Sequence, residues 1–345
     1  RCPRPPAVLA GIGPDVSLSA AATDPVNYAV RKAVVDLTGF SGLSEVTARF
    51  DKSALIPYTF NGQLFALPET QSFPLFFYRK DIFQELGITV PKTWEEFYEI
   101  VFVLQKNHMQ IGMQWQSAMS MFLYQNGGSY YNGAFTKSAL LSDQGVSAFK
   151  ETVNLYKLYR FANRFRGGEM PAGIVDYTMY NQLTVFAPEI KGLWGFAAVP
   201  GTADGAGGLD FSAPATGTGV IMLRGAKNRD NAWEFMKWWT SAAVQSRFGV
   251  EMESAMGPAA KQPSANIKAA EQMRWTSEEL KVIQAQREKL IGIPEVPGGY
   301  YTGRALEFAF TTVYAGNVDP VTTLEDNIAA VDEEIARKRQ EFGLD

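Results

Sequence analysis

Residues 78–97 read YRKDIFQELGITVPKTWEEF, and this stretch marks a change from strand to helix. Thr93 can cap a helix, and Glu96 three residues later completes the sequence pattern of a capping box. The helix that follows has one apolar face, formed by Phe97, Ile100, Val101 and Leu104. Because an apolar strand at 75–78 comes directly before it, the stretch is predicted to be a strand followed by a helix.

The same alternation continues along most of the chain. Further apolar strands are predicted at 109–115, 173–177 and 219–223, and long helices at 143–161 and 231–248. Asn61-Gly62 lies between two apolar runs and predicts a type I′ hairpin turn. Alternating strands and helices predict an α/β fold with largely parallel sheets, in which ligands bind beyond the carboxyl ends of the strands.

Composition excludes several functions. The 345 residues suffice for two domains, and Lys+Arg 32 against Asp+Glu 36 leaves no basic surface for nucleic acid. No apolar run approaches the roughly 18 residues of a transmembrane helix. One Cys and one His exclude an internal disulfide, a Cys-rich zinc site and a multi-histidine metal site.

Several segments, taken in order, resemble a known family. They are GPDV (13–16), NGQLFALPET (61–70), the stretch at 78–97, Gly127-Gly128, VPG (199–201) and KNRDNAWEFMKWW (227–239). Over nearly the whole chain this pattern is similar to the extracellular solute-binding proteins of bacterial ABC importers, in the sugar-binding group that includes maltodextrin-binding protein. The resemblance implies the two-lobed periplasmic-binding-protein type II fold, with ligand held in the cleft between the lobes.

The resemblance also implies a division of the chain. Lobe one is expected at 8–72 plus 216–256, lobe two at 73–215 plus 257–345, and residues 1–7 form a disordered tail. In the family about 60 residues precede the GPDV strand, so lobe one is expected to be incomplete at its N-terminus. The strand containing Val16 is therefore expected to be paired on one side only.

The implied function is non-catalytic binding of a sugar or oligosaccharide and its delivery to the transmembrane subunits of an ABC permease. The implied location is extracellular, at the cell surface or in the periplasm, with membrane contact only through a lipid anchor or the permease. Neither a cofactor nor a metal is expected.

Candidate ligand contacts come partly from the resemblance. Tyr177 aligns with an aromatic residue that stacks on sugar, although it can equally be a core aromatic, and Asp176 precedes it at the end of a strand. Trp115 and Gln116 match a sugar-contacting loop. The family also places polar ligand contacts in the loop after the GPDV strand, where this chain has Thr23 and Asp24. A matching segment at the start of a late helix brings an aromatic residue to the cleft, and the candidates there are Tyr300 and Tyr301, with Arg304 as a partner for hydroxyl groups or a carboxylate.

Glu69 and Gln71 lie at the first crossover between the lobes. A carboxylate and an amide there can face the cleft and bond hydroxyl groups, and the alternative is a pair of solvated hinge residues.

Two other functions remain open. The tandem tyrosines Tyr130-Tyr131 and Tyr300-Tyr301 are compatible with a ferric-ion binder or a binder of another small solute on the same fold. A glycoside-acting enzyme would need two carboxylates flanking a sugar, and no pair in the sequence carries such a signature.

Overall fold

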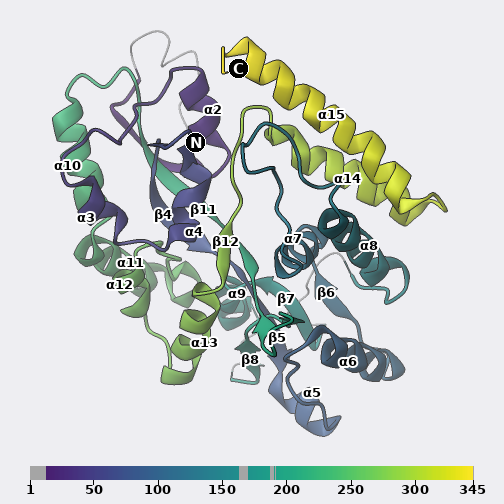
Figure 1. Ribbon diagram of the computed structural model, residues 1–345. Helices are drawn as coiled ribbons and strands as arrows, with labels where there is room; N and C mark the ends of the chain where they lie inside the picture. Colours follow the sequence, from purple (N-terminus) through teal and green to yellow (C-terminus); the bar gives the residue numbers. More distant parts are fainter. Residues whose placement is uncertain (1–12, 163–169, 187–189, 191, 345) are drawn as a thin grey trace.

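The computed structural model describes residues 13–162, 170–186, 190 and 192–344. The predicted tail at 1–7 lies outside these residues. Two four-stranded sheets lie one beside the other, each with helices packed around it (Figure 1). Strand β11 passes from one body to the other through the middle of the molecule.

The strands fall into two large sheets and two small hairpins. The first sheet has β11 at its centre, paired with β1, β4 and β12, and the second has the order β6-β7-β5-β8. The strands are β1 (Val16–Ala21), β2 (Thr59–Phe60), β3 (Gln63–Leu64), β4 (Leu67–Ser72), β5 (Pro74–Arg79), β6 (Ile111–Met113), β7 (Ala172–Asp176), β8 (Trp194–Ala197), β9 (Thr202–Ala203), β10 (Leu209–Asp210), β11 (Ala213–Met222) and β12 (Leu290–Gly292).

Helices occupy most of the remaining described chain. They are α2 (Asp24–Val30), α3 (Leu43–Thr47), α4 (Lys52–Leu55), η1 (Ile56–Tyr58), α5 (Lys80–Glu85), α6 (Trp94–Lys106), α7 (Trp115–Gln125), α8 (Asp143–Lys157), α9 (Met179–Phe186), α10 (Arg229–Trp239), α11 (Ala242–Met256), η3 (Pro258–Ala260), α12 (Ile267–Glu271), α13 (Ser277–Arg287), α14 (Tyr300–Ala315) and α15 (Pro320–Glu341). The predicted helix at 231–248 is two helices, α10 and α11, separated by Thr240 and Ser241.

Two predictions made from short stretches of sequence, the capping box at Thr93 and the turn at Asn61-Gly62, agree with the structure. The Thr93 hydroxyl accepts from the Glu96 backbone amide (3.2 Å), and the Glu96 carboxylate accepts from the Thr93 amide, so the capping box is confirmed. Asn61 and Gly62 both have positive φ, 48° and 77°, as a type I′ turn requires.

The expectation of largely parallel sheets is wrong for the described strands. β11 pairs antiparallel with β1 and β4, and β5 pairs antiparallel with β7 and β8. Among the described strands, β11 with β12 and β6 with β7 are the parallel pairs. The chain leaves the first sheet through β4 and enters the second directly as β5, so these neighbours are not joined by the helical crossovers that parallel pairs need.

Two separate apolar cores lie under the two sheets. The first contains Leu37, Leu67 and Val220 among others, and the second contains Phe76, Phe97 and Ile328. Strand β11 contributes to both cores: Ala215 packs in the second core and Val220 in the first.

The stretch at 263–267, predicted as part of lobe two, bonds to the first body. The backbone amide of Gln71 donates to the Pro263 carbonyl, and the backbone amide of Ile267 donates to the Arg49 carbonyl. Ala265 also packs in the first core. The other predicted lobe boundaries stay a prediction.

Strand β1 is an edge strand of its sheet within the described residues. Val16 pairs with Met222 of β11, and no other described strand pairs with β1. The expectation of one-sided pairing at Val16 is confirmed for this part of the chain. Among the described helices, none combines the length and the apolar character that crossing a membrane requires.

Candidate functional site

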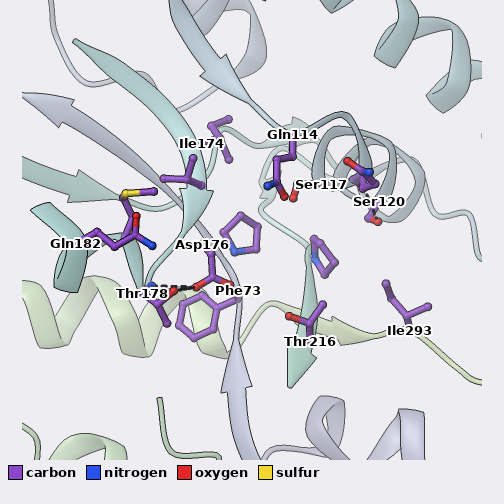
Figure 2. Close-up of a pocket in the computed structure, with 15 residues that line it drawn as sticks. Phe73, Gln114, Ser117, Ser120, Ile174, Asp176, Thr178, Gln182, Thr216 and Ile293 are labelled. Atoms are coloured by element: carbon purple, nitrogen blue, oxygen red, sulfur yellow. Dashed lines mark hydrogen bonds between the residues drawn. The ribbon is translucent and has the colours of Figure 1, made fainter. Parts of the chain in front are cut away.

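A pocket of about 430 Å³ lies where the chain crosses between the two bodies (Figure 2). Three crossing segments contribute to it: the start of β5, the first half of β11 and the residue that follows β12. The carboxyl ends of β6 and β7 and the first turns of α7 and α9 complete the wall. Its lining residues are Phe73, Pro74, Gln114, Gln116, Ser117, Ser120, Ile174, Val175, Asp176, Thr178, Met179, Gln182, Pro214, Thr216 and Ile293.

Asp176, a predicted contact, lines this pocket at the end of β7. Its Oδ1 accepts from the Thr178 amide at 2.9 Å and from the Thr178 hydroxyl at 2.6 Å, and its Oδ2 accepts from the Ser72 hydroxyl. Figure 2 shows Thr178 beside it. The carboxylate is thus held in one orientation, with acceptor capacity left for a ligand hydroxyl.

Three glutamines present side-chain amides to the pocket. Gln114 follows β6, Gln116 lies in the first turn of α7 and Gln182 lies on α9; all three are exposed. None of these three side chains makes a hydrogen bond to another described residue; the bond from Ser120 reaches the Gln116 backbone carbonyl. Each amide offers two donors and an acceptor, which suits a ligand rich in hydroxyl groups.

The aromatic side chain among the described lining residues is Phe73, itself only 2% exposed, and the predicted Tyr177 packs against it. Tyr177 is only 9% exposed and stacks on Phe73 with 4.7 Å between ring centroids and 23° between planes. Burial raises the pKa of the Tyr177 phenol above its ordinary value. In this structure Tyr177 has the burial of a core aromatic, and its role as a ligand contact stays a prediction.

Trp115 is also a core residue rather than a pocket residue. It opens α7, is 3% exposed and stacks on Phe310 with 5.0 Å between ring centroids. The predicted strand at 109–115 ends at Met113, so helical geometry turns the Trp115 ring into the core and leaves Gln116 in the pocket wall.

The crossover pair Glu69 and Gln71 is buried and fully engaged. The Glu69 carboxylate accepts from the Ser19 amide at 2.7 Å and from Trp239 Nε1 at 2.9 Å. The Gln71 side chain donates from Nε2 to the Ser53 hydroxyl at 3.0 Å and accepts at Oε1 from Arg287 Nη2 at 3.2 Å. Neither residue lines the pocket, and neither is a solvated hinge residue.

The remaining predicted contacts do not line this pocket. Thr23 is exposed before α2, and Asp24 begins that helix, where burial raises the pKa of its carboxyl.

At the start of α14, the Tyr300 hydroxyl bonds Glu334 of α15, and Tyr301 packs against the second core. The Arg304 guanidinium lies 5.3 Å from the Phe308 ring centroid. The pocket therefore unites two of the eleven predicted residues, Gln116 and Asp176.

Sequence reasoning missed most of the lining. Gln114 and Thr216 were recognisable only as polar residues next to predicted strands. Ser117 and Gln182 lie on helix faces where a polar residue carries no distinguishing signal, and Ile293 follows the short strand β12.

The hydroxyl groups of the tandem Tyr130-Tyr131 are engaged in hydrogen bonds within the fold. The Tyr130 hydroxyl bonds Ser120 at 2.8 Å, the Tyr131 hydroxyl bonds Thr302 at 2.9 Å, and burial raises the pKa of both phenols. A ferric ligand needs the phenolate, which this burial disfavours. Among the described residues, no three His, Cys, Asp or Glu side chains are grouped to hold a metal ion.

Comparison with known proteins gives one family match. The family described as bacterial extracellular solute-binding protein matches residues 5–246 of the chain. A protein of Brucella abortus (strain 2308) that carries the name of a binding protein is 24% identical over 310 residues, covering 84% of this chain and 72% of that protein.

Solved structures with the same fold include several sugar-binding proteins. The sugar-binding protein MalE from Xanthomonas citri gives a TM-score of 0.81 at 17% identity, covering 99% of this chain and 88% of that one. An ABC transporter solute-binding protein from Thermotoga lettingae, bound with α-D-tagatose, gives 0.77 at 18% identity, covering 96% and 87%. Maltose-bound T. maritima MalE3 gives 0.69 at 20% identity, covering 96% and 86%. These likenesses confirm the predicted fold class.

Proposed function

Because the chain belongs to the family of bacterial extracellular solute-binding proteins, we propose that it binds a small carbohydrate, without catalysis, in the pocket between its two bodies. The observation that carries the proposal is the set of three exposed amides, Gln114, Gln116 and Gln182, which the described fold leaves unused. They line the same pocket as the anchored Asp176 carboxylate and the apolar side chains of Phe73 and Ile293.

Carbohydrates need both kinds of surface. Their hydroxyl groups act as donors and acceptors together, which matches amides and a carboxylate, and their C–H faces pack on apolar side chains. A volume of about 430 Å³ lies in the lower part of the range for small-molecule sites. The sugars bound by the neighbours with this fold, tagatose and maltose, support the same ligand class.

We further propose delivery of the solute to an ABC permease, as the family membership suggests, with the protein at the cell surface or in the periplasm. The hinge for this cycle would consist of the three crossing segments near residues 72–74, 213–217 and 290–295. A third crossing near 290, rather than at 257, agrees with the bonds of residues 263–267 to the first body.

A glycoside-acting enzyme fits the pocket less well. Asp176 is the one carboxylate among the described lining residues, whereas glycoside hydrolysis ordinarily uses two.

Isothermal titration calorimetry with tagatose, maltose, mannobiose and maltotetraose tests the proposal. We expect at least one sugar to bind, and Gln182→Ala and Gln116→Ala each to weaken that binding by about tenfold, the loss of a single hydrogen-bonding side chain. Gln284→Ala, an amide on α13 outside the pocket, is the matched control and should bind like the parent. If no sugar binds, or if the pocket variants bind as the parent does, the proposed function is wrong.

A further inference from the structure

A second pocket between the two bodies has a different chemistry. It measures about 420 Å³ and is lined from the first body by α4, η1 and the β2–β3 hairpin. Phe135, from the loop between α7 and α8, closes it from the second body, and Pro294 and Glu295 enter from the third crossing segment. It shares no lining residue with the proposed carbohydrate pocket.

The wall of this second pocket is mainly apolar. Leu55, Ile56 and Phe60 form one side, with the turn Asn61-Gly62 at the edge, and the ring of Phe135 lies on the other. Phe135 has φ 55°, a left-handed conformation that is costly for an aromatic residue. A hydrogen-bonded turn holds it there, since its amide donates to the Asn132 carbonyl at 2.9 Å. The fold thus keeps an aromatic ring at this pocket at some conformational cost.

Glu295 is the acidic group of the pocket. Among the described residues its carboxyl has neither a hydrogen bond nor an ion-pair partner, and burial together with the nearby Asp24 carboxyl raises its pKa to about 8. The other ionisable groups facing it are the phenols of Tyr58 and Tyr131 and the ammonium of Lys52 at the exposed rim. The Glu295 side chain is partly exposed and lines the pocket, so a cation from outside the chain can reach its carboxylate and form a charge-assisted hydrogen bond with it.

We propose that this pocket binds a small organic cation, a protonated amine with an apolar or aromatic body. The ammonium group would pair with the Glu295 carboxylate, and the body would lie between Phe60 and Phe135. The two rings add cation–π attraction for an ammonium near their faces. Lys52 opposes a cation only weakly, because its exposed charge is hydrated and screened.

Binding by this mechanism is coupled to a proton. Below pH 8 the Glu295 carboxyl is largely protonated, so pairing with an ammonium must release that proton. The apparent affinity for an amine should rise about tenfold per pH unit up to pH 8 and then level off. A neutral ligand of the same shape should show no such rise.

Calorimetric titration of the intact chain with benzylamine, and with benzyl alcohol as its neutral counterpart, tests the proposal at pH 6, 7 and 8. We expect benzylamine to bind with the stated pH dependence and Glu295→Gln to weaken it by about 10- to 100-fold, as for a buried charged hydrogen bond. Phe135→Ala, on an exposed loop, should also weaken binding, and Glu307→Gln, an exposed acid on α14, should not.

Several results would overturn the proposal. They are equal binding of amine and alcohol, unchanged benzylamine binding by Glu295→Gln, and no binding at millimolar benzylamine. None of these measurements depends on whether a carbohydrate binds in the other pocket.

Discussion

Replacing Glu69 separates a structural role from a ligand-binding role for a crossover carboxylate. In the structure this side chain is 4% exposed and accepts from the Ser19 amide and from Trp239 Nε1. Hydrogen bonds to a charged group contribute about 1.5–3 kcal/mol each, and Glu69→Ala leaves both donors without this acceptor. We therefore expect Glu69→Ala to lower the free energy of unfolding by about 3–6 kcal/mol.

Thermal unfolding followed by circular dichroism measures this loss. At about 2.1 cal/mol/K of unfolding entropy per residue, a chain of 345 residues should lose about 4–8 °C in Tm. Glu69→Gln should lose about half as much, because one amide group can accept from only one of the two donors. Glu85→Gln, an exposed acid on α5, is the control and should melt like the parent.

The same variants should bind any sugar ligand with parental affinity at a temperature where they remain folded. The reasoning is refuted if Glu69→Gln melts like the parent but loses solute binding, since Glu69 would then contact the ligand rather than Ser19 and Trp239.

Three further perturbations follow from particular contacts. Arg287→Ala removes a buried guanidinium that donates from Nε and Nη2 to the Asp51 carboxylate at 2.9 and 2.7 Å. We expect the free energy of unfolding, measured by urea denaturation, to fall by about 2–4 kcal/mol. Arg287→Lys should restore only part of it, because an ammonium group lacks the paired donors of a guanidinium. Gly217→Ala places a Cβ 2.1 Å from the Thr70 carbonyl oxygen in β4, and the overpacking should cost about 1–3 kcal/mol, or more if the strands must separate, by the same assay. The pKa of the Glu295 carboxyl is raised in the folded chain, so this group favours the folded state most below its unfolded pKa of about 4.3. That contribution falls as the pH rises toward 8. We therefore expect Glu295→Gln to melt like the parent near pH 4 and several degrees higher than the parent at pH 8.

The sequence was sufficient for features that depend on neighbouring residues. The capping box at Thr93 and the left-handed turn at Asn61-Gly62 each involve a few consecutive residues, so their chemistry is complete in the local pattern. Pro68 shows where local reasoning falls short. Proline is usually confined to the edge or start of a strand, and Pro68 is the second residue of β4, opposite Gly219 at an irregularity in the pairing with β11, where a missing amide costs little.

Strand direction was also beyond local reasoning. Alternating strands and helices suggested parallel pairing, but β11 reaches β1 and β4 from a distant part of the chain and runs antiparallel to both. Register across such long separations is decided by which faces the cores bury, and a single chain sequence does not reveal which strands become neighbours.

Phe73 and Tyr177 show why the lining of the pocket was harder to predict than the fold. The two residues lie opposite each other at the junction of β5 and β7, where the Tyr177 amide donates to the Phe73 carbonyl at 2.9 Å. Each is aromatic, each adjoins a strand end, and each fits either a core or a pocket position by its own sequence. Only the pairing of β5 with β7 and the passage of β11 beside them decide that Phe73 is among the lining residues and that Tyr177 stacks on it. Because three crossing segments form part of this pocket's wall, the proposed ligand surface adjoins the proposed hinge, and closing the bodies would reshape the pocket.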